Sequence, residues 1–292
     1  MHANSMCISC LIAKQEKEIR QYSDENKKSE YMHQLLEILY KHGQSESAPW
    51  ISEQINQLYE NFWGKVEDYT LLKRKYNTLL LDKESEIEHR IRKSDDPIKT
   101  CIKYVCAANY IDFFAVGNVD EQTCEKLLEK AESELIQEEE YLNFRNDLAK
   151  AKKLVYLTDN CGEIVLDKLF IRFLKEKYPR LKITAIVRGK NVINDATLED
   201  AEEVGLTDVV PCIGNGNSAP GTVFKKLNEE SKKVLLEADL IISKGQGNFE
   251  SLFGEGINPY YLFLCKCELF VNRFGLQQYG PIFMKEERIK AI

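Results

Sequence analysis

The second half of this 292-residue chain contains no histidine, since the last of its four histidines is His89. Without an imidazole, residues 152–292 cannot form a Ser-His-Asp triad, and a zinc site of the usual histidine type is not expected there. No apolar run reaches the length of a membrane span, and the N-terminus lacks the basic segment and apolar core of a signal peptide. We therefore expect a cytoplasmic protein without a membrane partner.

The chain also lacks an excess of basic residues. It has 40 Lys and Arg against 47 Asp and Glu, which gives a formal net charge of −7. This balance argues against a general nucleic-acid binder, because such proteins usually present a basic face. With 43% hydrophobic and 30% charged residues, the composition is typical of a globular protein with a sizeable core. The length allows one large domain or two ordinary ones.

Two common nucleotide-binding motifs are missing as well. A dinucleotide-binding loop requires G-x-G-x-x-G directly after the first strand, but residues 158–163 contain a single glycine, Gly162. A P-loop of the form G-x-x-x-x-G-K-[ST] does not occur anywhere in the chain. A mononucleotide or dinucleotide site of either standard type is therefore not expected.

Cysteine, in contrast, is abundant, with nine residues. In a cytosolic protein these are most simply reduced, partly buried thiols. The alternative is a metal or redox site built from Cys7 and Cys10, joined by Cys265 and Cys267. That site requires the two ends of the chain to meet in space, because a lone C-x-x-C lacks the second pair of a zinc ribbon.

The hydrophobic pattern divides the chain near Lys152. Before it the pattern is helical, including one long amphipathic helix over residues 52–80 and a charged one over 122–151. After it, short apolar runs alternate with helical segments, as in a doubly wound α/β domain. The predicted strands are residues 154–157, 183–187, 208–211, 240–243 and 261–265, with a possible last strand around Phe283. Three of these runs lack polar alternation, which favours parallel strands buried on both faces.

Three unusual loops follow predicted strands, and they comprise residues 159–163, 188–197 and 244–250. In a parallel sheet, loops that follow the strands emerge at one edge, which is where ligands bind in open α/β sheets. We therefore expect these loops to converge on one cleft, although they are far apart in the sequence.

The side chains of these loops suggest a metal and an anion. Asp159, Asn160 and Asp195 carry hard oxygen donors, which suit a divalent ion and leave positions for water and substrate. Arg188 and Lys244 add positive charge of the kind that binds phosphate. A metal beside an anion site indicates hydrolysis of a phosphate ester, with Asp159 or Asp195 as base or nucleophile.

The third loop adds flexible backbone to this arrangement. Gly245 and Gly247 allow main-chain N–H groups to approach an anion, and a helix after Asn248 would direct its N-terminus at the same place. Each loop alone has a simpler interpretation, since Asp and Asn often cap helices and glycine often marks a tight turn. Only the occurrence of all three loops at strand ends indicates a functional site.

These loops resemble those of a known family, the metal-dependent damage-control phosphatases, formerly domain-of-unknown-function family 89. The N-terminal Cys-x-x-Cys is similar to that of a short, cysteine-bearing branch found mainly in prokaryotes. Cys161 replaces the alanine of many relatives, which should not disturb the ligands. The matching segments are residues 158–163, 187–189, 193–197 and 243–250, with further matches at 96–97, 108–113 and 266–268.

The resemblance implies a helical domain, residues 1–151, on a Rossmann-like, mostly parallel α/β domain, residues 152–292. It implies that Asp159, Asn160 and Asp195 hold a divalent ion, and we expect Mn²⁺, Co²⁺, Ni²⁺ or Mg²⁺. The implied reaction is removal of phosphate from small metabolites, such as sugar phosphates or damaged cofactor phosphates.

The helical half also contributes candidate residues. Asn109 and Asp112 would reach the cleft and shape the substrate pocket, or else form a polar pair that fixes the domain interface. Two other functions stay open at this point. One is a carboxyl methyltransferase that uses S-adenosylmethionine, an activity described for a longer branch of the family, and the other is a non-catalytic metal- or nucleotide-binding module.

Overall fold

The fold is built on a six-stranded sheet with the order β3-β2-β1-β4-β5-β6. The structure is a computed structural model and describes residues 1–64, 68–109, 121–275 and 277–290. The first five strands are parallel, and β6 is antiparallel to β5. The strands are β1 (Lys153–Leu157), β2 (Lys182–Val187), β3 (Cys212–Gly214), β4 (Leu240–Lys244), β5 (Tyr260–Leu264) and β6 (Pro281–Lys285).

The strand order reverses between β1 and β4. From β1 the chain moves outward to β2 and β3, and it then returns to the other side of β1 to form β4. At such a switch point the loops that leave the two central strands diverge, which opens a crevice at their carboxyl ends. The register places the first two loops and the third at one level, since Leu157 lies beside both Ile186 and Ser243.

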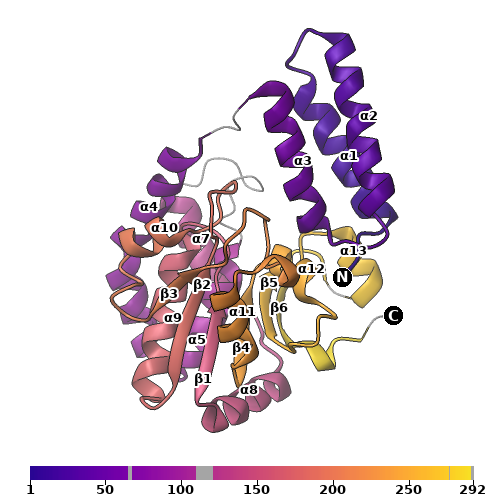
Figure 1. The fold of residues 1–292 in the computed structure, drawn as a ribbon. Coiled ribbons are helices and arrows are strands. Elements are labelled where there is room, and N and C mark those ends of the chain that lie inside the picture. The colour runs from indigo at the N-terminus through magenta and orange to yellow at the C-terminus, as the bar shows by residue number, and fades with distance from the viewer. Residues whose placement is uncertain (65–67, 110–120, 276, 291–292) are drawn as a thin grey trace.

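Helices cover both faces of the sheet (Figure 1). In β1, Leu154 and Tyr156 face one core, whereas Val155 and Leu157 face the other, as strand alternation requires. The first core includes side chains of α4 (Thr70–Lys93), α5 (Pro97–Ala108), α7 (Glu121–Ser133), α8 (Glu138–Lys150) and α9 (Glu163–Lys177). The second includes side chains of α11 (Glu229–Leu236), α12 (Gln246–Leu252) and α13 (Glu268–Phe274).

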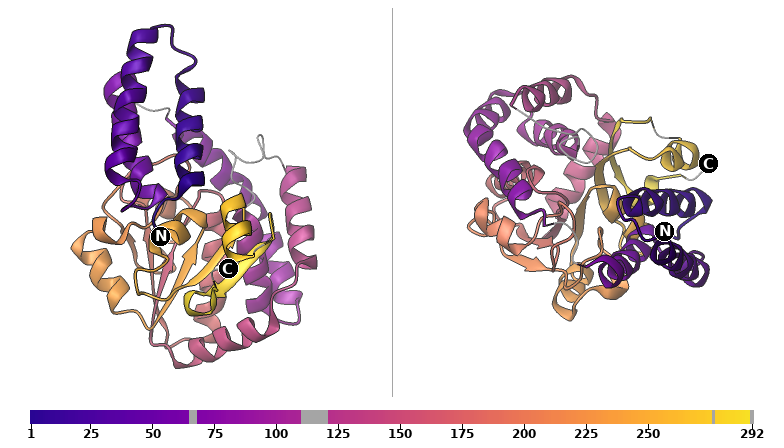
Figure 2. Two further views of the ribbon diagram at one scale, coloured as in Figure 1. Left: turned by 90° about the vertical axis from the view of Figure 1, so that its right-hand side faces the viewer. Right: turned by 90° about the horizontal axis from the view of Figure 1, so that it is seen from above.

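The three N-terminal helices form a separate bundle that projects from one end of the sheet, as the left view of Figure 2 shows. They are α1 (Ser5–Ile19), α2 (Glu25–His42) and α3 (Ala48–Trp63). The side chains of Asn4, Asp24 and Ser47 each accept a hydrogen bond from the first turn of the helix that follows. The bundle has a hydrophobic cluster of its own, so the helices before β1 do not pack as one unit.

The structure corrects three of the predicted elements. The prediction of a single helix over residues 52–80 is wrong, because α3 ends just before Gly64. The φ of +90° at Gly64 stops the helix. The helix over 122–151 is divided into α7 and α8 at residues 134–137. The strand at 208–211 is wrong too: residues 208–210 form a turn and β3 begins at Cys212. Pro211 has no N–H for a ladder, although its carbonyl accepts from Ala185 N.

The predicted strands at 154–157, 183–187, 240–243 and 261–265 match β1, β2, β4 and β5 to within one residue at each end, and the possible strand around Phe283 is β6. Asn109 is the C-cap residue of α5, and the predicted site residue Asp112 lies outside the described residues. In the part of the chain that the structure describes, no helix is both long and apolar enough to cross a membrane.

Candidate functional site

Main-chain hydrogen bonds join the first two predicted loops at the end of β1. Cys161 N donates to Asn194 O, and Ala196 N donates to Asp159 O, both at 2.8 Å. These bonds form an isolated antiparallel bridge between Asn160 and Asp195. The expected convergence of the two loops is therefore present, and their polar side chains start from adjacent points of the backbone.

Arg188 connects the two predicted aspartates through its guanidinium group. Its Nε donates to Asp195 Oδ2, and its Nη2 donates to Asp159 Oδ1 at 3.3 Å. The Nη1 donates to Asn248 Oδ1 at 2.9 Å and to Thr222 Oγ1 at 3.2 Å. All five side chains are buried, with Arg188 only 2% exposed. Asp159 and Asp195 thus lie within the span of one guanidinium.

The other oxygen of Asp159 is held from the helical half of the chain. Asn109 Nδ2 donates to Asp159 Oδ2 at 3.1 Å and to Glu163 Oε2 at 3.3 Å. The Oδ1 of Asn109 accepts a hydrogen bond from Leu264 N at the end of β5. Asn160 Nδ2 also donates to Asp159 Oδ2, at 2.9 Å. The structure therefore places Asn109 directly at the site, where it also links α5 to the sheet.

Lys244, at the end of β4, is fully buried and faces α9. Its Nζ lies 2.7 Å from Asp167 Oδ1 and 3.8 Å from Glu163 Oε2. Tyr156 Oη donates to the same Asp167 oxygen at 2.6 Å. Burial raises the pKa of Asp167 above its ordinary value, although Lys244 opposes this effect. In this state Lys244 neutralises carboxylates, and its expected contact with phosphate stays a prediction.

The buried charges of the site do not balance. Four carboxylates accompany two cations, and these groups are Asp159, Glu163, Asp167 and Asp195, with Arg188 and Lys244. Burial, and then the negative charges of Glu163 and Asp195, raise the pKa of Asp159 well above its ordinary value, while Arg188 lowers it in part. This surplus of negative charge favours a cation at the site.

The donor set fits a hard divalent ion. Asp159, Asn160 and Asp195 offer oxygen donors from two carboxylates and one amide, and such ligands suit Mg²⁺ or Mn²⁺ with water in the remaining positions. Among the described residues, no three His, Cys, Asp or Glu side chains are grouped so that they could hold a metal. Any ion here would therefore depend on the asparagine and on solvent as well as on the aspartates.

The glycines of the third loop allow close packing of the site. Gly245 has a φ of +81°, and a Cβ built there would lie 1.9 Å from Asp159 Oδ2. A Cβ at Gly247 would lie 2.3 Å from Pro220 O, so this loop packs tightly against residues 214–221. The helix begins at Gln246, not after Asn248 as the sequence predicts. The third loop thus brings backbone, rather than side chains, against Asp159.

Asn248 has a different setting from the one expected. Its Nδ2 donates to Lys244 O at 2.6 Å and to Thr158 O at 3.0 Å, while its Oδ1 accepts from Arg188 and Thr222. These bonds join the ends of β1 and β4 and fix the guanidinium. Direct binding of phosphate by Asn248 stays a prediction.

Sequence reasoning missed several residues of this network. Glu163 and Asp167 lie one helical turn apart in α9, among apolar residues that are themselves buried. Two acidic residues at that spacing within an apolar helix were a signal that could have been used. Thr222 gives no comparable signal, because nothing in the sequence relates it to Arg188.

The cysteines at the two ends of the chain do lie in one region. The amino group of Met1 donates to Glu250 O and Phe253 O, both at 2.9 Å, and Cys7 and Cys267 pack against the same hydrophobic cluster. Cys7, Cys10, Cys265 and Cys267 are all free thiols. They are not grouped as metal ligands within the described ranges, so the proposed alternative of a cysteine metal site is not supported.

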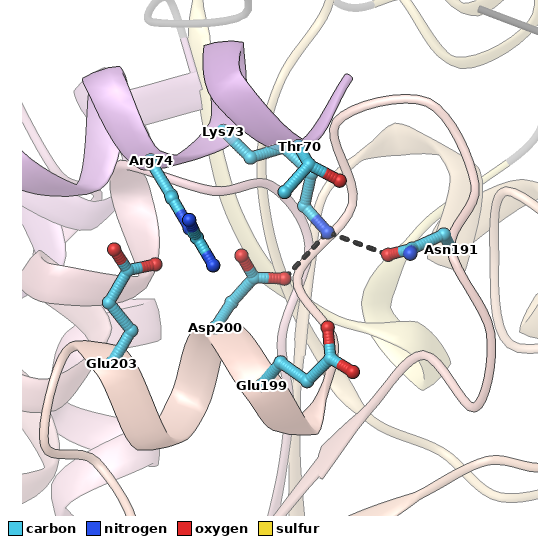
Figure 3. A pocket seen from close by; sticks show the side chains of 7 residues that line it. All are labelled: Thr70, Lys73, Arg74, Asn191, Glu199, Asp200 and Glu203. Atoms are coloured by element: carbon cyan, nitrogen blue, oxygen red, sulfur yellow. Dashed lines mark hydrogen bonds and ion pairs between the residues drawn. The ribbon is translucent and has the colours of Figure 1, made fainter. Parts of the chain in front are cut away.

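A polar pocket of about 170 Å³ lies between α4 and α10 (Leu198–Glu203), as Figure 3 shows. It adjoins the second loop through Asn191, and neither Asp159 nor Asp195 lines it. Its lining consists of Thr70, Lys73, Arg74, Asn191, Glu199, Asp200 and Glu203.

Known proteins resemble this chain over almost its full length. Residues 3–281 match the family model of the damage-control phosphatase ARMT1-like domain. A damage-control phosphatase of Archaeoglobus fulgidus is 30% identical over 283 residues, which cover 94% of this chain and 96% of that protein. A damage-control phosphatase of Pyrococcus horikoshii is 28% identical over 205 residues, or 67% and 68% of the two chains.

A solved structure agrees with the fold. The crystal structure of a DUF89 family protein from Pyrococcus horikoshii matches with a TM-score of 0.82 at 24% identity, and the match covers 98% of this chain and 99% of that one. At this identity the structural match establishes the shared fold, and the family model and the archaeal relative establish the lineage. The chain therefore belongs to the ARMT1-like damage-control phosphatase family.

Proposed function

We propose that this protein is a metal-dependent phosphatase that acts on small phosphorylated metabolites such as sugar phosphates or damaged cofactor phosphates. The observation that carries the proposal is the pair of buried aspartates, Asp159 and Asp195, that share the guanidinium of Arg188 at the switch point of the sheet. Family membership supports the phosphatase activity, and the surplus of buried carboxylates supports the metal dependence.

Asp159, Asn160 and Asp195 would hold Mn²⁺, Co²⁺, Ni²⁺ or Mg²⁺. When bound, a divalent ion supplies Lewis acidity and lowers the pKa of a coordinated water. Asp159 and Asp195 are also the groups with the chemistry of a base or nucleophile at this edge of the sheet. Asn109 orients the Asp159 carboxylate through its hydrogen bond to Oδ2.

Arg188 would bind the phosphoryl group of a substrate. Its planar guanidinium suits phosphate oxygens, and its contacts with Asn248 and Thr222 fix the plane in advance. Fixed donors stabilise the charge that develops during phosphoryl transfer without further reorganisation. The main-chain N–H groups near Gly245 would add to this effect.

The test is release of inorganic phosphate from p-nitrophenyl phosphate and from a panel of sugar phosphates, with each of the four metals in turn. D159N and D195N keep the size of the side chain and remove its charge, so we expect both to lose metal-dependent turnover. D208N is the matched control, because Asp208 is exposed and lies in the turn before β3, whereas the site lies at the carboxyl ends of the strands.

Full metal-dependent turnover in D159N or D195N would defeat the assignment of the site. A titration with S-adenosylmethionine separates the proposal from the methyltransferase alternative. Heat of binding in that titration, with no phosphate release under any of the four metals, would support methyl transfer instead.

A further inference from the structure

Asn77 on α4 has an amide side chain that contacts the first of the two loops that carry the aspartates, and also α10, the helix that directly follows the second. It is fully buried, and none of its atoms belongs to the proposed donor set. Its Oδ1 accepts a hydrogen bond from Gly162 N at 2.8 Å. Its Nδ2 donates to Glu203 Oε2 at 3.2 Å and to Asp200 Oδ1 at 3.4 Å.

The first of these contacts fixes the turn that follows Asp159 and Asn160. Gly162 is the N-cap residue of α9, with a φ of +81°, and no side chain caps that helix. A Cβ at Gly162 would lie 3.2 Å from Tyr76 Cβ, so α4 packs directly on the turn. The amide of Asn77 therefore provides, from another helix, the acceptor that this turn lacks locally.

The second contact is with α10, whose first turn supports the end of the loop that contains Asp195. Asp200 Oδ2 accepts hydrogen bonds from both Thr197 N and Thr197 Oγ1 at 2.8 Å, which closes the capping box of α10. Thr197 in turn forms a parallel bridge with Arg188. Asn77 holds the other oxygen of Asp200, so its Nδ2 acts on the segment between Asp195 and α10.

Lys73, one turn earlier on α4, reinforces the same segment. Its Nζ lies 2.6 Å from Asp200 Oδ2 and donates to Asn191 Oδ1 at 3.1 Å, as drawn in Figure 3. Lys73 contacts the second loop and α10 but not the first loop, whereas Asn77 joins the first loop to α10. A single side chain that accepts from one loop and donates to the support of the other can set the spacing between them.

We propose that Asn77 is a positioning residue that fixes loop 159–163 relative to loop 188–197, and thereby sets the geometry of Asp159, Asn160 and Asp195. The effect on metal binding rests on the proposed function. Residues that orient metal ligands typically contribute a factor of about 10–100 in metal affinity or activity.

The experiment compares N77A with L80A. Leu80 lies on the same helix and is fully buried in the core, without a polar contact to either loop. Both variants should lower the thermal stability. In the metal-free protein, only N77A should speed hydrogen–deuterium exchange of peptides that cover both 159–163 and 195–200. In a calorimetric titration, N77A should bind Mn²⁺ about 10–100-fold more weakly, and L80A should stay close to the wild type.

Exchanging the amide and the carboxylate of this pair tests the same contact by rescue. N77D keeps an acceptor for Gly162 N, but it removes the donor and places a carboxylate opposite Asp200 and Glu203. Adding D200N returns a donor to the pair, so N77D/D200N should bind Mn²⁺ more tightly than N77D alone. Unchanged exchange and Mn²⁺ affinity in N77A, or equal losses in N77A and L80A, would overturn the proposal.

The outcome also separates this inference from the proposed function. A wild-type protein that releases no phosphate with any metal removes the proposed function. The exchange comparison on the metal-free protein still decides, by itself, whether Asn77 fixes the two loops.

Discussion

At the scale of single residues, the site depends on a few positions where only one side chain fits. Gly245 is one of these, because its positive φ and the nearby carboxylate of Asp159 both exclude a Cβ. Asn248 is another, since it uses both ends of its amide to join two strands and to hold Arg188. Such residues determine where the charged groups of the site lie.

We expect G245A to damage the site more than its backbone conformation alone would explain. An alanine at positive φ costs about 1–2 kcal/mol, and the overlap with Asp159 should add about 1–3 kcal/mol. Gly254 is the matched control, because its φ is +89° but no atom lies within 4 Å of its Cβ position. Urea unfolding of G245A and G254A isolates the clash. Equal stabilities and equal phosphatase activities of the two variants would contradict this account.

At the scale of elements, α3 is tied to the loop that packs against the third loop of the site. Glu53 on α3 accepts hydrogen bonds from Ser218 N at 3.0 Å and from Ser218 Oγ at 2.9 Å, and it also pairs with Lys226. The Nζ of Lys226 also lies 4.9 Å from the ring centre of Trp50, which is on α3 like Glu53. These contacts join the N-terminal bundle to residues 214–221.

This connection should give a defined pH dependence. Burial raises the pKa of Glu53, but hydrogen bonds from Lys226 and Ser218 outweigh it, so the folded pKa lies below the ordinary value of 4.5. The stabilisation is then present above pH 4.5 and is lost as the pH falls through the folded pKa. E53Q should be less stable than the wild type by about 1–3 kcal/mol at pH 7.

Thermal unfolding between pH 7 and pH 3.5 measures this difference, which should shrink toward the acid end. E60Q is the control, because Glu60 lies on the same helix and is exposed. A difference in stability between E53Q and the wild type that stays constant over this range would mean that the charge of Glu53 does not stabilise the contact between α3 and residues 214–221.

The elements also show what the sequence could and could not predict. Apolar runs that end in Asp-Asn or Lys-Gly mark β1 and β4 correctly, because parallel strands are buried on both faces and must place polar residues at their ends. The break at Gly64 was missed because the helical spacing of apolar residues continues in the helices on both sides of it. The turn at 208–210 was missed because a short apolar run suits a strand as well as a turn. The partners Glu163 and Asn77 depend on packing between distant segments, which no local pattern contains.

At the scale of the whole molecule, the helices that follow the N-terminal bundle belong to the packing of the sheet. α4 and α5 lie in the same core as β1, and they carry Asn77 and Asn109 to the site. The predicted boundary near residue 152 therefore marks a change in the sequence pattern, while the site itself is assembled from both sides of it.

Metal should stabilise this assembly as a unit. At a Mn²⁺ concentration 100 times the dissociation constant, binding adds about 2.7 kcal/mol to the free energy of unfolding, which corresponds to a rise of roughly 4–5 °C in Tm for a chain of this size. EDTA should reverse the rise, and D195N should not show it, whereas D208N should. If neither Mn²⁺ nor EDTA changes the Tm of the wild type, the metal does not stabilise the fold.

The surplus of buried carboxylates has a consequence for how metal uptake would be observed. Burial and the nearby carboxylates raise the pKa of Asp159, so a cation that binds there displaces any proton that its carboxyl group holds. Uptake of Mn²⁺ in weakly buffered solution should therefore acidify the medium. For the same reason, the apparent enthalpy in a calorimeter should vary with the ionisation heat of the buffer, so that two buffers that do not bind the metal give different values for one and the same binding event.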